Sequence, residues 1–261
     1  MSIEAKLRCN VSYKEVSMLF KKLILSLVVA LSIINPIAAY AITLIPGGDS
    51  IGIELDYQGV VITGGYEVKT TDDIYNPDKQ SFGALGHAME DTTLNSDLLQ
   101  SGKIFESTVT SIKKATPNHS GNKIADISNV EIGSINSHNQ FGIYGTYNYD
   151  ISKKKSMETA NIDEIELGKA YFLTVLDGQK IQKCEIEITK LNNQDSIKEK
   201  GIEFKVTDQA VTKQANGIVQ GMSGSPIIQN DKIIGCVTHV SGNNPMLGYG
   251  LYIEWMLEMD K

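Results

Sequence analysis

The sequence has few of the residues that build metal sites and disulfide scaffolds. Its 261 residues include three cysteines and four histidines, without a Cys-x-x-Cys pair or a cluster of His with Cys. Such clusters are the usual signature of zinc sites, so we expect neither a metal nor another cofactor. Cys9 precedes the apolar segment described below. Cys184 and Cys236 are interpreted as buried free thiols, although an oxidising compartment would allow them to pair.

Basic residues are outnumbered by acidic ones. The chain has 24 Lys and Arg against 31 Asp and Glu, a formal net charge of −7. Five of the basic residues and two of the acids lie within residues 1–41, so the rest of the chain is more acidic than the total suggests. Binding to the phosphate backbone requires clustered cations. We therefore exclude nucleic acid as a partner.

The main apolar run is too short for an ordinary membrane-spanning helix. Leu23–Ile34 covers 12 residues, whereas a spanning helix needs about 20. Lys21 and Lys22 precede this run, and Ala39-Tyr40-Ala41 follows it, which is the pattern of a secretory signal. Residues 1–41 are therefore predicted to be a signal peptide or, if uncleaved, an N-terminal membrane anchor. The domain that follows, residues 42–261, is expected to work outside the cytoplasm.

Strand signals dominate the exported part, which is rich in glycine (23 in the whole chain) and has one tryptophan. Apolar and polar residues alternate in several short runs, as expected for strands with one buried face. The clearest are Ile51–Leu55, Val60–Ile62, Tyr171–Leu176, Cys184–Leu191 and Ile233–Val240. Asp177-Gly178 and Asn230-Asp231 lie between such runs and are predicted to be hairpin turns.

Helix signals are scarce, and the best is Tyr252–Met259 at the C-terminus. Lysine-rich stretches at 113–123 and 152–156 are predicted to be surface loops, and the second suggests a boundary between two β subdomains near residues 150–160. Many short strands with little helix predict an all-β fold. Composition does not distinguish a barrel from a sandwich.

The strongest chemical signal is Gly221-Met222-Ser223-Gly224-Ser225-Pro226. A serine hydroxyl becomes a nucleophile when a base removes its proton and backbone N–H groups stabilise the developing oxyanion. The glycines permit a tight turn that would direct the N–H groups of Gly221 and Ser223 into one pocket. The alternative interpretation is a Gly/Ser loop leading into a strand. The pattern resembles G-D-S-G-G-P of chymotrypsin-like proteases, with Met222 and Ser225 as departures.

A serine protease also needs a histidine, and His87 is the best candidate. It follows a glycine-rich turn, Gly83-Ala84-Leu85-Gly86, and precedes the serine in the chain as this fold requires. His119 and His138 lie in polar, turn-like segments. His239 is on the strand after the nucleophile, which lines the substrate cleft in this fold.

Four blocks together resemble the peptidase family of stage IV sporulation protein B from endospore-forming bacteria. They are Ile45–Gly52, Gly83–His87, Gln220–Ile227 and Gly248–Met256. The resemblance covers the chain from Ile45 onward and implies a chymotrypsin/trypsin-like double β-barrel, here with a short C-terminal helix, and a Ser-His-Asp mechanism.

The resemblance also implies roles for individual residues. His87 would be the general base and then the acid for the leaving amine, and Asp208 would orient its imidazole. Asp91 and Asp126 remain rivals for the third position, and a strand-end turn is the alternative interpretation of Asp208. By analogy with the fold, Thr238 and His239 border the substrate-binding site.

The family's biology gives the functional expectation. Its members act between the forespore and mother-cell membranes, where they cleave a membrane-bound regulator and so release an intramembrane protease. We expect limited signalling proteolysis of such a partner in that intermembrane space or in the cell envelope. Relatives typically carry a PDZ domain before the peptidase, and here only a few residues separate Ala41 from Ile45. The alternative function is an inactive peptide-binding or regulatory protein that retains the peptidase fold.

Overall fold

The computed structural model describes residues 42–57, 99–117, 119–139, 142–148, 153–194 and 196–259. The chain divides into two compact units, Met1–Ala41 and Ile42–Lys261, and all described residues belong to the second. The leader segment, the expected strand Val60–Ile62, Asp91 and His87 lie outside the described residues. The domain boundaries and the nature of residues 1–41 therefore stay predictions.

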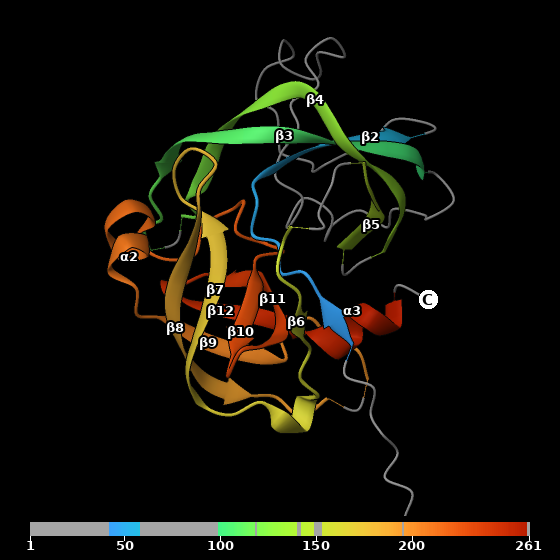
Figure 1. The fold of residues 1–261 in the computed structure, drawn as a ribbon. Helices are drawn as coiled ribbons and strands as arrows, with labels where there is room; N and C mark the ends of the chain where they lie inside the picture. The colour runs from blue at the N-terminus through green and yellow to red at the C-terminus, as the bar shows by residue number, and fades with distance from the viewer. Residues whose placement is uncertain are drawn as a thin grey trace, which may run out of the picture. The chain divides into compact units, whose positions relative to one another are not determined.

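The second half of the chain forms a closed six-stranded barrel (Figure 1). Neighbouring strands are antiparallel and follow the order β10-β11-β12-β9-β8-β7. Pairing of Ile227 with Phe172 and of Ile228 with Tyr171 closes the barrel between β10 and β7. The strands are β7 (Gly168–Val175), β8 (Ile181–Leu191), β9 (Ile202–Val206), β10 (Pro226–Gln229), β11 (Lys232–Ser241) and β12 (Asn244–Tyr252).

Alternation of side chains along these strands explains the barrel. In β8, Cys184, Ile186 and Ile188 are buried, while Glu185 and Glu187 between them are exposed. Successive side chains of a strand point to opposite faces, so this pattern places one face inside the barrel. The interior also contains Phe172 and Phe204, whose ring centroids lie 6.4 Å apart.

Both predicted hairpin turns are present. Asn230 and Asp231 connect β10 to β11 with φ values of 50° and 59°. Positive φ at both central residues defines a type I′ turn, whose twist matches that of the flanking strands. Gly178 has φ 62° in the turn between β7 and β8. Local sequence therefore fixes the register of these two strand pairs.

The first half of the described chain forms a four-stranded antiparallel sheet in the order β2-β3-β4-β5. Its own small core contains Ile104, Ile132 and Ile135. A separate pair joins β1 (Thr43–Leu44) to β6 (Met157–Glu158). The strands of the sheet are β2 (Ile51–Tyr57), β3 (Leu99–Lys113), β4 (Asn122–Asn139) and β5 (Gly142–Tyr147).

The predicted all-β class with a short C-terminal helix is confirmed, and the closed barrel excludes a simple sandwich for the second half. The predicted helix is α3 (Ile253–Met259), where Ile253 packs with Ile228 and Ile233. Two short elements were not predicted: α2 (Gln209–Ala215) and the 3₁₀ turn η2 (Ile162–Glu164). The stretch 113–123, predicted to be a loop, contains the end of β3 and the start of β4 as well.

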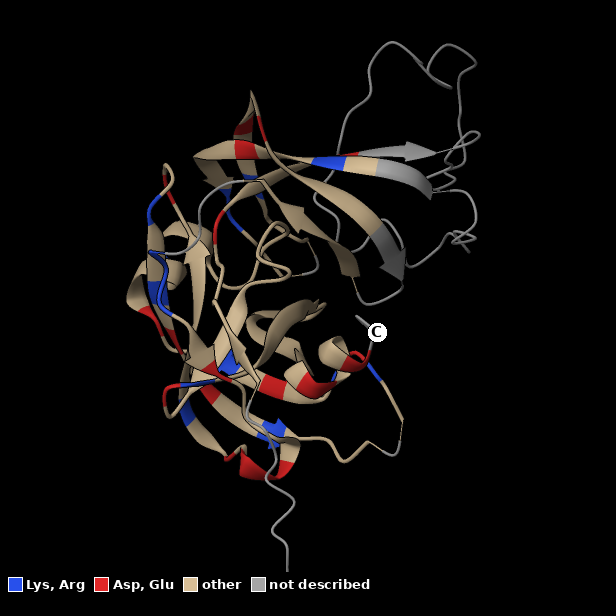
Figure 2. Cartoon of the chain, turned by 45° about the vertical axis from the view of Figure 1, so that its right-hand side comes forward, with Lys and Arg blue, Asp and Glu red and all other residues tan. Residues whose placement is uncertain are grey.

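Basic and acidic positions are interspersed along the described chain (Figure 2), and acidic residues lie in η2 and in the first turn of α3. Among the described residues, no helix is both long and apolar enough to cross a membrane. Likewise, no group of His, Cys, Asp and Glu among them could hold a metal ion.

The two barrel cysteines give a test of the core. Cys184 and Cys236 are free and buried, and burial raises the pKa of each thiol to about 12. Because the thiolate is the reactive form, we expect an alkylating reagent at pH 8 to spare both in the native protein and to modify both in denaturant. Peptide mass spectrometry separates them from Cys9. Fast native labelling of either barrel thiol, or a Cys184–Cys236 disulfide, would show that this packing is wrong.

Candidate active site

Two consecutive β-turns shape the segment around Ser223. The N–H of Met222 donates to the carbonyl of Val219 at 3.1 Å, and the N–H of Ser225 donates to the carbonyl of Met222 at 3.1 Å. The third residue of each turn is a glycine, Gly221 with φ 89° and Gly224 with φ 82°. A type II turn requires positive φ at this position, which glycine adopts without steric cost. The glycine spacing thus encodes the loop.

The loop is held at its centre and at its far end. Met222, between the two turns, is fully buried and belongs to the barrel core. The N–H of Gly224 donates to the carbonyl of Val237 at 2.8 Å, and the N–H of Val237 donates to the carbonyl of Ser225 at 2.9 Å. The side chain of Ser223 is therefore presented to solvent from a fixed backbone, beside strand β11.

Two backbone donors of this loop are available for a ligand. The N–H groups of Gly221 and Ser223 donate to no acceptor among the described residues, whereas those of Gln220, Met222, Gly224 and Ser225 are all hydrogen-bonded. Gly221 and Ser223 are the residues expected to form an oxyanion hole. Unpaired N–H groups on a fixed backbone are what such a site needs, since they can stabilise an anion without reorganising.

The Ser223 hydroxyl donates to the carbonyl oxygen of Thr238 at 3.1 Å. This contact places Thr238 of β11 directly beside Ser223, and the predicted role of this strand at a substrate site stays a prediction. The Thr238 hydroxyl lies within hydrogen-bonding distance of the carbonyls of Glu199 and Tyr249, at 3.1 and 3.2 Å. Thr238 therefore offers its carbonyl, and not its hydroxyl, to the site.

His239 is buried next to a carboxylate. Its Nε2 lies 3.3 Å from Oε2 of Glu199, and the two side chains are 8% and 29% exposed. Glu199 belongs to the segment between β8 and β9 and was not predicted as part of the site. No local sequence pattern could have found it, because its pairing with β11 depends on the tertiary fold.

Asp208 is the N-cap of α2. Its Oδ1 accepts from the N–H groups of Ala210 at 2.7 Å and Val211 at 3.0 Å, and its Oδ2 accepts from the N–H of Glu185 at 3.2 Å. Capping satisfies donors that the first turn of a helix leaves unpaired. Each described hydrogen bond of this carboxylate thus goes to backbone. A carboxylate has about four acceptor positions, so one remains for an imidazole.

No hydrogen bond or ion pair links Asp208, Asp126 or His119 to Ser223 among the described residues. Asp126 is exposed on β4, opposite Thr108 on β3. His119 lies exposed in the loop between β3 and β4. The assignment of His87 and the choice of third triad member stay predictions.

Lys123 is a neighbour of the loop that the sequence did not indicate. Its N–H donates to the carbonyl of Gln220 at 2.9 Å, and its Nζ lies 2.7 Å from Oγ1 of Thr174. Burial lowers the pKa of Lys123 to about 8. The sequence around Lys123 is polar and rich in lysine, which favours a surface loop. The partial burial of this one lysine could therefore not be predicted.

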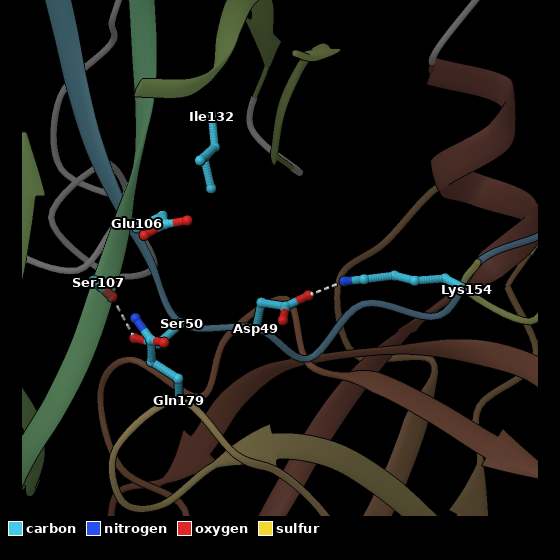
Figure 3. A pocket seen from close by; sticks show the side chains of 7 residues that line it. All are labelled: Asp49, Ser50, Glu106, Ser107, Ile132, Lys154 and Gln179. Carbon is cyan, nitrogen blue, oxygen red and sulfur yellow. Dashed lines mark hydrogen bonds and ion pairs between the residues drawn. The ribbon is translucent and has the colours of Figure 1, made fainter. Parts of the chain in front are cut away.

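A polar cavity of about 250 Å³ is lined by residues outside this loop (Figure 3): Asp49, Ser50, Glu106, Ser107, Ile132, Lys154 and Gln179. Its lining contains an ion pair between Nζ of Lys154 and Oδ2 of Asp49 at 2.7 Å and a hydrogen bond from Ser107 to Ser50 at 2.7 Å. Ser223 does not line it. We therefore assign no catalytic role to this cavity.

A family model, that of the SpoIVB peptidase S55 family, matches residues 62–257. The chain therefore belongs to this family and is a serine peptidase, which confirms the resemblance seen in the sequence. No curated protein sequence matches the chain.

Among solved structures, the chain is similar to Rv3671c of M. tuberculosis. An inactive serine-to-alanine form aligns with 14% identity and a TM-score of 0.31, over 67% of this chain and 72% of that one. The active form of the Rv3671c protease aligns with 14% identity and a TM-score of 0.29, over 61% of this chain and 62% of that one. These TM-scores are too low for the alignment to assign residue roles.

Gly224 provides a test of the loop geometry. An added Cβ there would meet no atom within 4 Å, so Gly224→Ala introduces backbone strain at φ 82° and no clash. A left-handed conformation costs an L-residue about 1–2 kcal/mol, and we expect the free energy of unfolding to fall by that amount.

The matched control is Gly242→Ala, where the space is equally open and φ lies outside the left-handed region. There, alanine should leave the free energy of unfolding unchanged or raise it by up to about 1 kcal/mol. Urea denaturation measures both variants. Equal stabilities for the two would mean that Gly224 does not adopt the left-handed conformation.

Proposed function

We propose that this chain is an exported serine endopeptidase that performs limited signalling proteolysis during sporulation. Its substrate would be a membrane-associated protein that regulates an intramembrane protease. Membership of the SpoIVB family supports this role, and the signal-like segment before Ala41 supports action in the intermembrane space of the forespore or in the cell envelope.

The chemistry begins with the Ser223 hydroxyl. A rotation about its χ1 releases the hydrogen bond to Thr238, and His87 then takes the proton as the oxygen attacks the scissile carbonyl carbon. The tetrahedral oxyanion accepts hydrogen bonds from the N–H groups of Gly221 and Ser223. His87 returns the proton to the leaving amine, and a water molecule hydrolyses the acyl-enzyme by the same sequence of transfers.

One observation carries this proposal: in a loop fixed by Met222, the two N–H groups next to an exposed serine are unpaired among the described residues. Both donors lie on a backbone that the barrel core holds in place, and one of them belongs to the exposed serine itself. Removal of a single oxyanion donor typically costs about 10²–10³ in rate, so their preorganisation is a large part of the expected catalysis.

The position of β11 supports substrate binding at Thr238 and His239. Because the carbonyl of Thr238 touches the nucleophile, a peptide bound along this strand would bring its scissile bond to Ser223. Glu199 adds a partly exposed carboxylate beside His239. Together with the acidic composition, this favours a basic substrate segment.

A fluorophosphonate probe tests the peptidase assignment. We expect the probe to label the folded wild-type protein. The labelling rate of Ser223→Ala and of His87→Ala should fall at least about 10³-fold, because either change removes the activated nucleophile. Ser196→Ala, an exposed serine remote in sequence, is the matched control and should label like wild type. Circular dichroism establishes that each variant is folded.

Undiminished labelling of Ser223→Ala, or a folded wild type that the probe never labels, would refute the peptidase assignment. The signalling role has its own readout. In sporulating cells that carry only Ser223→Ala, a reporter of the late sporulation sigma factor should stay silent. A normal reporter would refute the signalling role alone.

Asp208→Asn separates capping from catalysis. Asparagine caps a helix about as well as aspartate, whereas alanine costs about 0.5–2 kcal/mol. If Asp208 orients His87, we expect Asp208→Asn to keep most of the free energy of unfolding and to lose about 10⁴ in turnover, as in a trypsin-like triad. Asp208→Ala should lose both. Wild-type turnover in Asp208→Asn would assign the third position to another acid, with Asp91→Asn and Asp126→Asn as the next variants to measure.

A further inference from the structure

Lys123 contacts the oxyanion-hole glycine across a long sequence separation. An ideal Cβ built on Gly221 would lie 3.2 Å from Cβ, 3.4 Å from Cγ and 3.3 Å from Cδ of Lys123. The lysine stem therefore lies flat against the Cα of Gly221. A side chain at position 221 would displace it, which gives this glycine a second function beside its positive φ.

Backbone pairing fixes the same contact. Asn122 and Gln220 form a parallel bridge, in which Lys123 donates its N–H to Gln220 at 2.9 Å and Gln220 donates its own to Gly121 at 2.9 Å. Gln220 and Gly221 share a peptide group, whose N–H is one of the two proposed oxyanion donors. Because the carbonyl of Gln220 is held by Lys123, the opposite end of that planar peptide, the N–H of Gly221, is directed away from β4.

The head group of Lys123 is anchored on the barrel. Its Nζ lies 2.7 Å from Oγ1 of Thr174, which is 1% exposed on β7. Two bonds of about 1.5 Å link Cδ to Nζ, so the ammonium lies within about 7–8 Å of the Cα of Gly221. No carboxylate pairs with it among the described residues.

Burial is the largest influence on the pKa of Lys123, and the charge interaction with Cys184 on β8, a neighbour of Asp208, opposes it. Burial lowers the pKa of Lys123 to about 8, so the amine is mostly charged at pH 7 and mostly neutral at pH 9.5. An ammonium at this distance adds positive potential where the oxyanion forms, and that potential weakens as pH rises through 8.

We propose that Lys123 is a positioning residue of the peptidase: it fixes the Gln220–Gly221 peptide and adds positive charge behind the oxyanion hole. This role rests on the proposed function, because it acts through the N–H of Gly221. Lys123 lies about 100 positions before Ser223 in the sequence, and it belongs to the sheet and not to the barrel.

Lys123→Met tests this role, since methionine keeps most of the stem and removes the charge. We expect the rate of fluorophosphonate labelling at pH 7 to fall roughly 10- to 100-fold, less than or similar to the loss of an oxyanion donor. The ratio of the wild-type rate to the Lys123→Met rate should shrink several-fold between pH 7 and pH 9.5. Taking the ratio at each pH removes the pH effects that the two proteins share. Lys123→Arg, which keeps the charge, should recover much of the rate at pH 7.

Two controls address folding. Lys123→Met leaves the buried hydroxyl of Thr174 without its donor, whereas the double variant Lys123→Met/Thr174→Val removes both partners and should fold better. This double variant is expected to label as slowly as Lys123→Met. Lys103→Met, at a largely exposed lysine on β3 paired with Glu131, should label like wild type.

Wild-type labelling of the folded Lys123→Met protein at both pH values would overturn the proposal while leaving the peptidase intact. The proposal would also be overturned if Lys123→Met labelled slowly, the ratio of the two labelling rates stayed constant with pH, and Lys123→Arg recovered no rate. Lys123 would then have only a packing role. A wild-type protein that is never labelled would instead refute the proposed function.

Discussion

Burial of Met222 in the barrel core is the constraint on which the active-site loop depends. Its side chain is fully enclosed, and truncation of a buried methionine usually costs about 2–5 kcal/mol. That cost exceeds the strain of either flanking turn, because Gly221 and Gly224 remove the penalty for positive φ. Burial in the core directs the Met222 side chain inward. The next residue, Ser223, exposes its side chain to solvent.

This arrangement explains why an apolar residue precedes Ser223. In the G-D-S-G-G-P pattern the corresponding residue is an aspartate, whereas here the loop is fixed by an apolar side chain. The loop and the barrel therefore share one hydrophobic core. Ile227, two residues after Ser225, is also fully buried in that core. Changes in the barrel interior should therefore reach the catalytic loop directly.

Local features were predictable from the sequence because short-range physics determines them. The glycine spacing around Ser223, the turn at Asn230-Asp231 and the alternation of Cys184, Ile186 and Ile188 each encode a local geometry, and the structure shows all of them. The helix α2 was missed although its signals were present. Asp208 is a good N-cap, and Asn216 ends the helix in the left-handed conformation with φ 58°.

Contacts between distant segments could not be predicted. Lys123 meets Gly221, and Glu199 meets His239, only because the tertiary fold brings segments from separate parts of the chain together. Nothing in the neighbouring residues of Lys123 indicates that it is withdrawn from solvent. The same limit applies to the triad: an aspartate that suits the family pattern at Asp208 is also an ordinary helix cap, and sequence alone does not separate the two roles.

A crystal structure of the phosphonylated protein would test the central claim most directly, since a phosphonyl oxygen occupies the place of the tetrahedral oxyanion. The account predicts a bond from phosphorus to Oγ of Ser223, with one phosphonyl oxygen about 2.7–3.1 Å from the N atoms of both Gly221 and Ser223. An adduct on another residue, or a phosphonyl oxygen directed away from those two N–H groups, would contradict it.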